Sequence, residues 1–305
     1  MYPSKIISLL SLLFLAIQVS IAQTQTHENS TSSPFDFLTK IQGSQKGQNV
    51  NGVKDLKKFL KKFGYLDSQS TSGLDSKTSN NNDDGNTDVF DEKTESAIKL
   101  YQKNFNLNQT GILDSATLSL MTRPRCGRSD KNIRLKNAED TIKPDFKFYT
   151  RNEKWTKTTI TYGFMNGTPK IGTYAIRVSL AKWAKVTKFT FQYTDNYDKA
   201  DLKFSFQKRK HLDNDAFDGP GGVYAHAWAP PVGHVHFDSE EPWKLNAGLG
   251  SVDLYTIALH EIGHALGLEH SDVQSAVMWP YVGFGEIKDL GQDDIQGIKA
   301  LYNLK

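Results

Sequence analysis

The stretch His260-Glu261-Ile262-Gly263-His264-Ala265-Leu266-Gly267-Leu268-Glu269-His270 decides how the rest of the chain is interpreted. On a helix, residues four positions apart share a face, so His260 and His264 can direct their imidazole nitrogens at one metal ion, with Glu261 beside them. Gly267 has no Cβ, which lets the backbone turn sharply enough to bring His270 round as a third ligand. Three histidine ligands leave the fourth tetrahedral position of a zinc ion open for water. The stretch therefore predicts a zinc site of the open, catalytic type.

Zinc in an open site lowers the pKa of its bound water and polarises a carbonyl group, and Glu261 is placed to act as the general base. The alternative is an amphipathic helix whose histidines are ordinary surface or core residues. Five specified positions match by chance with a probability of roughly one in ten thousand or less, which favours the metal site.

The eleven-residue pattern is that of the metzincin clan of metalloproteases. Ala276-Val277-Met278-Trp279-Pro280 resembles the methionine turn of that clan, which implies that Met278 forms an apolar floor under the zinc. Ser271 after His270 narrows the resemblance to the matrix metalloproteinases, or matrixins. The resemblance implies a zinc-dependent endopeptidase that hydrolyses peptide bonds of extracellular proteins. An astacin-like metzincin is the enzymatic rival, and Ser271 and the cysteine motif described next disfavour it.

Cys126 is the single cysteine of the chain, so it cannot form an internal disulfide. It lies in Pro124-Arg125-Cys126-Gly127-Arg128-Ser129-Asp130, which resembles the cysteine switch of matrixin pro-regions. A thiolate binds zinc strongly and would exclude the catalytic water until the pro-region is removed. The resemblance also implies that Arg125 pairs with Asp130. The alternative is a buried structural cysteine.

Seven of the eight histidines lie between residues 211 and 270. Apart from the zinc-helix set, the resemblance implies a second, structural zinc whose four ligands fill a tetrahedron. These ligands are His211, Asp213, His226 and His236.

The segment 217–223, Phe-Asp-Gly-Pro-Gly-Gly-Val, resembles the matrixin calcium loop, in which carboxylates and backbone carbonyls supply hard oxygen ligands. The match implies one Ca²⁺ bound by Asp218, Gly219, Gly221, Val223, Asp238 and Glu241. Without the family, the same segment is a glycine-rich turn that holds an ion in about half of cases. Residues 228–234 are shorter than in vertebrate relatives and lack their aspartate, so a second calcium site at Asp201 is left out of the prediction.

An apolar run from Ile6 to Val19 follows Lys5 and ends before small residues, which predicts a cleaved signal peptide at residues 1–22. An uncleaved membrane anchor is the alternative. We expect a propeptide over 23–147, with the cysteine switch at 124–130, and a catalytic domain over 148–305. Activation is expected to cut between Asp130 and about Phe148, by self-cleavage or by another extracellular protease.

Within the propeptide, helical periodicity from Val53 and again after Asp91 and Asp114 predicts a small all-α domain over 49–121. It resembles the peptidoglycan-binding-like module of matrixin pro-regions. Residues 23–45 are expected to be a flexible lead-in and 67–88 a mobile polar loop. The four lysines on the other face of the first helix, Lys57, Lys58, Lys61 and Lys62, are interpreted as a solvated helix face.

In the expected catalytic domain, the alternation and spacing of apolar residues predict strands at 158–162 and 189–193 and helices at 175–186, 254–266 and 293–302. The fold class is α+β, a metzincin-type domain with a twisted mixed sheet and a zinc helix. The resemblance implies that an edge strand at 224–227 pairs with an extended substrate and that 280–282 forms the wall of an apolar pocket.

The near balance of 37 basic and 34 acidic residues implies neither a nucleic-acid partner nor a membrane surface. Sequons at Asn29, Asn108 and Asn166 fit a secreted, extracellular protein, in the apoplast or the extracellular matrix. The build is most similar to short plant matrixins that lack a hemopexin domain. Expected partners are protein substrates of matrix or cell wall and protein inhibitors, with a monomeric chain and no stable membrane insertion. A non-catalytic extracellular binding protein on a protease-like fold is the alternative function.

Overall fold

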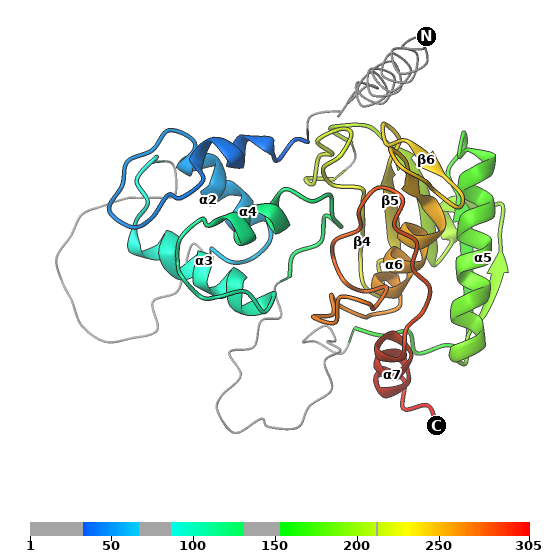
Figure 1. Ribbon diagram of the computed structural model, residues 1–305. Helices are drawn as coiled ribbons and strands as arrows, with labels where there is room; N and C mark the ends of the chain where they lie inside the picture. The colour runs from blue at the N-terminus through cyan, green and yellow to red at the C-terminus, as the bar shows by residue number, and fades with distance from the viewer. Residues whose placement is uncertain (1–32, 67–86, 131–152, 212) are drawn as a thin grey trace, which may run out of the picture. The chain divides into compact units, whose positions relative to one another are not determined.

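A five-stranded sheet carries the C-terminal part of the chain in the computed structural model, which describes residues 33–66, 87–130, 153–211 and 213–305 (Figure 1). The strand order is β2-β1-β3-β5-β4, and only β4 runs antiparallel to its neighbour. The sheet is therefore mixed, and β4 lies at its edge. The strands are β1 (Thr159–Phe164), β2 (Thr190–Tyr193), β3 (Leu202–Gln207), β4 (Ala225–Ala227) and β5 (His234–Asp238).

Alternation of buried side chains explains the two central strands. Ile160 and Tyr162 in β1, and Leu202 and Phe204 in β3, belong to the same core, whereas Thr159, Thr161 and Lys203 between and before them are more exposed. A short pair of strands, β6 (Trp243–Lys244) and β7 (Val252–Asp253), leads into the zinc helix. The sheet places the histidines of β4 and β5 directly across from each other, since His226 pairs with His236.

Three helices complete this part: α5 (Lys170–Val186), α6 (Leu254–Ala265) and α7 (Gln292–Leu301). α5 and α6 pack side by side, and the indole Nε1 of Trp183 in α5 donates to the carbonyl of Leu259 in α6 (2.9 Å). Asp253 caps α6 by accepting from the backbone N–H of Thr256. Every residue of α6 except Tyr255 is buried, so its histidines are held inside the packed core.

The N-terminal part is helical, with the 3₁₀ helix η1 (Asp36–Ile41) and helices α2 (Val53–Lys62), α3 (Glu92–Asn104) and α4 (Ser115–Met121). Asp91 caps α3 by accepting from the N–H of Thr94, as the sequence predicts, and Asp114 caps α4 in the same way through the N–H of Thr117. The all-α interpretation of this part and the α+β class of the C-terminal part are confirmed.

Three local interpretations are wrong in part. The expected flexible lead-in forms η1 from residue 36 on, because Leu38 and Ile41 are completely or almost completely buried in the helical core. The side chain of Lys57 is 2% exposed, and its ammonium pairs with Asp91 (2.7 Å) instead of facing water. Asp88, assigned to the mobile loop, accepts hydrogen bonds from the N–H groups of Gly52 and Lys54 at the start of α2.

The described residues contain two hydrophobic clusters. One fills the space between the sheet, α5, α6 and α7. The other is the helical core, and it continues into four residues of the C-terminal part: Phe217, Val223, Trp279 and Tyr281. No helix among the described residues is long and apolar enough to cross a membrane. The proposed signal peptide, Asn29 and the expected activation region at 131–148 lie outside the described residues.

Candidate metal centres and cleft

The three histidines of the zinc helix and the turn after it meet at one point. α6 places His260 and His264 one turn apart, and their ring centroids are 4.7 Å apart. Gly267 has φ +103°, which turns the chain so that His270 comes within 4.7 Å of His264 and 5.3 Å of His260, ring to ring. A Cβ at Gly267 would lie 2.5 Å from the carbonyl oxygen of Glu153, so only glycine fits this turn.

Hydrogen bonds at Nδ1 fix the orientation of all three rings. Nδ1 of His260 lies 2.7 Å from the carbonyl oxygen of Val277, and Nδ1 of His264 lies 2.8 Å from that of Leu268. Nδ1 of His270 lies 2.6 Å from Oδ1 of Asp130. When Nδ1 carries the proton and donates it, Nε2 keeps a lone pair for a metal.

The remaining ring nitrogens are suited to a metal ion. Nε2 of His260 and Nε2 of His270 are buried and have no hydrogen-bond partner among the described residues. Burial, with a contribution from the neighbouring rings, lowers the pKa of His260 and of His264 well below its usual value. Neutral rings with unpaired Nε2 atoms are the donor set of a zinc site.

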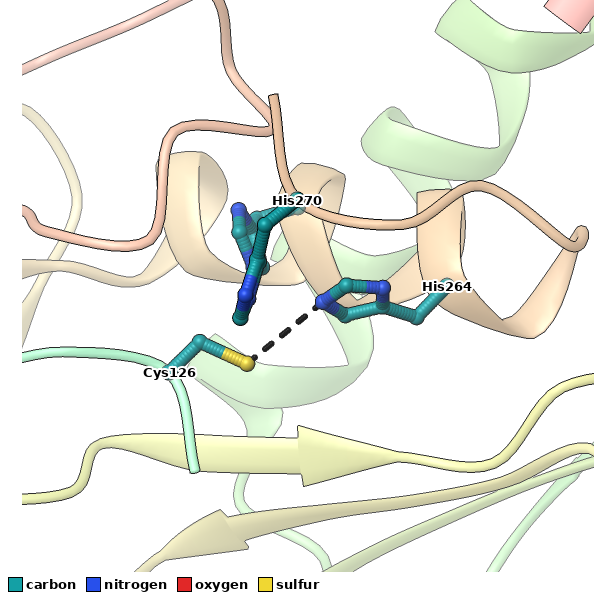
Figure 2. A group of neighbouring side chains, drawn as sticks. Cys126, His264 and His270 are labelled. Atoms are coloured by element: carbon teal, nitrogen blue, oxygen red, sulfur yellow. Dashed lines mark hydrogen bonds between the residues drawn. The ribbon is translucent and has the colours of Figure 1, made fainter. Parts of the chain in front are cut away.

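Cys126 completes the group. Its Sγ lies 3.5 Å from Nε2 of His264, and Figure 2 shows the sulfur pointing toward that ring with His270 beside it. The candidate ligand atoms of Cys126, His260, His264 and His270 all lie within 4.8 Å of one another. Burial, and next the Glu261 carboxylate, raise the pKa of the Cys126 thiol well above its usual value in the metal-free chain. A metal ion would reverse this, because a coordinating thiol is deprotonated.

Glu261 lies beside the histidines and is fully buried. Neither carboxylate oxygen makes a well-formed hydrogen bond to any described residue. Burial raises the pKa of Glu261 to about 8, against the lowering effects of Cys126 and Arg128. A carboxyl group with such a pKa can take up and release a proton near neutral pH.

Met278 packs directly against α6. A Cβ added at Gly263 would lie 2.4 Å from the Met278 sulfur, so this helix position must be glycine for the methionine to approach. The turn around Met278 is held by Asp294 of α7, whose two oxygens accept from the N–H groups of Val277 (2.9 Å) and Met278 (3.0 Å). Sequence reasoning missed Asp294, because an acid in the first turn of a helix is ordinary.

The segment that carries Cys126 is held between two walls by backbone hydrogen bonds. On one side, the N–H of Arg125 donates to the carbonyl of Gly222 (2.9 Å) and the N–H of Gly127 to that of Ala225 (2.8 Å). On the other side, the N–H of Cys126 donates to the carbonyl of Pro280 (2.9 Å), and Val282 donates back to Pro124 (3.3 Å). The walls are the edge strand and the wall segment that the sequence assigned to substrate.

Arg125 and Asp130 are both buried and form an ion pair, with 2.7 Å between Nη2 and Oδ1. The Arg125 guanidinium also lies over the ring of Phe63 and donates to the hydroxyl of Tyr281 (3.0 Å). Burial alone would raise the pKa of Asp130, but Arg125 and then His270 hold it well below its usual range. Sequence reasoning missed the contact of Phe63 with Arg125, because an aromatic residue on an apolar helix face is typical of any core. It placed Tyr281 in the pocket wall but did not predict its hydrogen bond with Arg125.

The second histidine cluster lies on β4, β5 and the loop before them. Oδ2 of Asp213 is 3.0 Å from His211 Nε2, 3.2 Å from His226 Nε2 and 2.9 Å from His236 Nδ1. His226 Nε2 is also 3.3 Å from the facing nitrogen of each of the other two rings. Burial lowers the pKa of His226 to about 3 and of His236 to about 4. Four donor atoms crowded around one point suit a closed tetrahedral metal site.

The predicted calcium ligands form a looser group. Asp218 accepts from the N–H of Val223, and Glu241 accepts from the N–H of Gly221. Asp238 Oδ2 and Glu241 Oε2 are buried without a partner among the described residues. Burial raises the pKa of Asp218, of Asp238 and of Glu241, the last to about 8, and the carboxylates repel one another. Buried acids with unpaired oxygens suit a hard cation such as Ca²⁺.

The carbonyls of this loop are partly engaged. That of Gly221 accepts from the Ser33 hydroxyl (2.9 Å), and that of Asp218 accepts from the Arg209 guanidinium, which also fills the space beside Gly219. Asp201, by contrast, is paired with Lys157 and accepts from the N–H of Thr161. The two sequons within the described residues, at Asn108 and Asn166, are exposed.

Comparisons with known proteins show which families the chain resembles. The family model described as matrixin matches residues 154–303, and that of a putative peptidoglycan binding domain matches residues 49–121. The metalloendoproteinase 5-MMP of Arabidopsis thaliana is 36% identical over 90% of this chain and 77% of its own length. Metalloendoproteinase 1 of Glycine max is 34% identical over 98% and 96%, and the neutrophil collagenase of Homo sapiens is 35% identical over 89% and 55%.

Proposed function

The chain belongs to the matrixin family of zinc metalloendopeptidases, and from this premise we propose that it is a secreted protease synthesised as a latent precursor. Its substrates are proteins, as the activity of the family implies. In the proposed arrangement, His260, His264 and His270 hold the catalytic zinc, and Cys126 holds the fourth position until activation.

The observation that supports latency is the position of Cys126. A lone buried thiol lies 3.5 Å from the nitrogen that His264 would offer to the metal, in a segment that fills the cleft between two walls. A structural cysteine would need no such placement. The ion pair of Arg125 with Asp130 fastens the segment on the side of His270.

When bound, zinc supplies a Lewis acid that polarises the scissile carbonyl and acidifies water. His260 and His264 are oriented through Nδ1 by carbonyls of the proposed catalytic domain, so these two rings need no reorganisation to hold the metal. The Nδ1 partner of His270 is Asp130, which belongs to the proposed propeptide and leaves with it. Glu261 receives the proton of the attacking water and delivers it to the leaving amine. Its buried carboxyl, which makes no well-formed hydrogen bond to a described residue, suits both tasks.

The proposal includes a signal peptide at 1–22, a propeptide at 23–147 and a catalytic domain at 148–305, with the product outside the cell. His211, Asp213, His226 and His236 hold a structural zinc, and the 218–241 loop holds Ca²⁺. The proposed substrates are proteins of the extracellular matrix or the cell wall. Protein inhibitors are the proposed regulators. We further propose a monomer with glycans at the three sequons, including the exposed Asn108 and Asn166.

The test is hydrolysis of a broad quenched peptide by the purified chain, before and after a thiol-reactive mercurial, with and without a zinc chelator. We expect activity to appear on mercurial treatment and to vanish with the chelator. Glu261→Gln should lose cleavage by a factor of about 100 or more while keeping its zinc content, because it removes only the proton acceptor.

Two results would count against the proposal. Full activity of the intact, untreated chain would exclude the cysteine switch. No activity under any condition, with zinc bound, would favour the non-catalytic binding protein instead.

A further inference from the structure

An ion pair lies at the end of the cleft occupied by the Cys126 segment. Nη2 of Arg123 is 2.8 Å from Oε2 of Glu286, and both side chains are about one-third exposed (32% and 31%). The N–H of Gly283 donates to the same carboxylate oxygen (2.8 Å), and the N–H of Glu286 donates back to the Gly283 carbonyl (3.1 Å). The turn 283–286 therefore fixes the Glu286 carboxylate independently of Arg123.

Glu286 continues the wall that holds the segment. Pro280 and Val282 make backbone hydrogen bonds to Cys126 and Pro124, and the next contact outward is that of Arg123 with Glu286. Arg123 precedes Cys126 by three residues. The Glu286 carboxylate therefore pairs with the residue three positions before the proposed zinc ligand.

We propose that Glu286 is a specificity-determining residue that binds a basic side chain of the substrate, about three residues from the bond that is cut. The inference rests on the proposed function. Removal of the propeptide takes Arg123 away from Glu286, whereas the Gly283 N–H that orients the carboxylate remains. An extended substrate that uses the same wall can place an Arg or Lys side chain where Arg123 lies.

Lys288 neutralises Glu286 only in part. Its Nζ is 3.5 Å from Oε1 of Glu286, on the oxygen that Arg123 does not use. The Lys288 side chain is largely buried, and Nζ donates to the carbonyls of Gln274 (2.7 Å) and Ala276 (3.2 Å). Glu286 accepts a hydrogen bond from Arg123 while Lys288 is also near its other oxygen. The site therefore tolerates a second cation.

The test uses the mercurial-activated chain with its propeptide removed and two series of quenched peptides. One series carries Arg, Gln or Glu at the third position before the cut, the other at the third position after it. In one of the two series we expect kcat/KM to be about three- to fivefold higher for Arg than for Gln, and lowest for Glu. A ratio of this size is what a partly exposed ion pair contributes. Raising the salt concentration should reduce the difference.

Glu286→Gln keeps an oxygen for the Gly283 N–H and removes only the charge, so it should abolish the preference for Arg. Asp198→Asn, an equal charge change at an exposed residue of η2 (Tyr197–Lys199), should leave it intact. Equal rates for Arg, Gln and Glu in both series, or a preference that survives Glu286→Gln, would overturn the inference. Failure to cleave any peptide would instead count against the proposed protease activity.

Discussion

At the scale of single residues, the zinc ligands could be predicted because their spacing encodes their geometry. Residues 260 and 264 share a helix face whatever surrounds them, and a glycine at 267 permits the turn to His270. The groups that orient the rings could not be predicted in the same way. Two of them are backbone carbonyls, of Val277 and Leu268, and the third is Asp130, which is 140 residues distant from His270 in sequence.

Asp130→Asn should weaken latency. The change leaves the Arg125 guanidinium buried without its counter-charge, and breaking a buried pair costs about 3–5 kcal/mol. We expect the intact variant to hydrolyse a quenched peptide without mercurial, at a rate well above the untreated parent chain. Asp55→Asn, which alters an exposed pair with Lys58, is the matched control and should stay latent. If the untreated variant is as inactive as the untreated parent chain, Asp130 does not hold the Cys126 segment in place.

Gly267→Ala should impair the zinc site. The backbone at this residue has φ +103°, and the new Cβ would press on the Glu153 carbonyl, so the turn to His270 must shift. We expect less than one zinc per catalytic site after dialysis, measured by atomic absorption, and a lower Tm. Gly248→Ala is the control, because its Cβ would meet nothing within 4 Å. Full zinc content in Gly267→Ala would contradict the role given to the turn.

At the scale of elements, capping residues and apolar periodicity predicted most helices to within a residue or two. α5 is the exception, since it begins at Lys170 and not at 175. The errors arose where polar composition concealed a buried role. Lys57 belongs to a run of lysines, and only the structure shows that its ammonium reaches Asp91 at the start of α3. The prediction of a flexible lead-in was wrong for a similar reason, because two apolar residues, Leu38 and Ile41, are too few to form a periodic pattern.

Asp91 should make the helical part sensitive to acid. Burial alone would raise the pKa of Asp91, but the hydrogen bonds from Lys57 and Thr94 hold it below its usual range. A carboxyl whose pKa is lower in the folded chain contributes stability above its unfolded pKa, about 3.9, and loses it as the pH falls through the folded value. Hydrogen exchange of α3 amides, corrected for intrinsic rates, should therefore accelerate below about pH 4.

Asp91→Ala should bring the same acceleration at pH 6, because it removes both the cap and the counter-charge of the buried Lys57 ammonium. The loss of the cap alone is worth about 1 kcal/mol. Asp55→Ala removes only an exposed pair and should leave the α3 exchange rates unchanged. Identical exchange in Asp91→Ala and the parent chain would rule out this role for the pair.

At the scale of the whole molecule, the order of motifs predicted the two kinds of architecture, but not how their cores join. Periodicity identifies a buried face and says nothing of its partner. Phe105 of the helical part packs its ring against those of Trp279 (5.2 Å) and Tyr281 (5.3 Å), and the hydroxyls of Tyr101 and Tyr281 are 2.7 Å apart. The wall of the proposed substrate cleft is thus part of the core of the proposed propeptide.

This shared core implies that cutting the chain between Asp130 and Phe148 is not sufficient for activation. After the cut, the backbone bonds on both sides of Cys126 and the aromatic contacts of Phe105 remain, so the propeptide should stay bound and the protease silent. Gel filtration of the cut chain should recover both fragments in one peak, and activity should appear only on dilution or in mild denaturant. Phe105→Ala should release the propeptide at a lower denaturant concentration than Phe90→Ala. Phe90 is a buried residue of the helical core whose ring makes no contact with the rings of Trp279 or Tyr281 in the described part of the chain. Immediate activity of the cut parent chain would instead mean that the covalent link, and not the shared core, maintains latency.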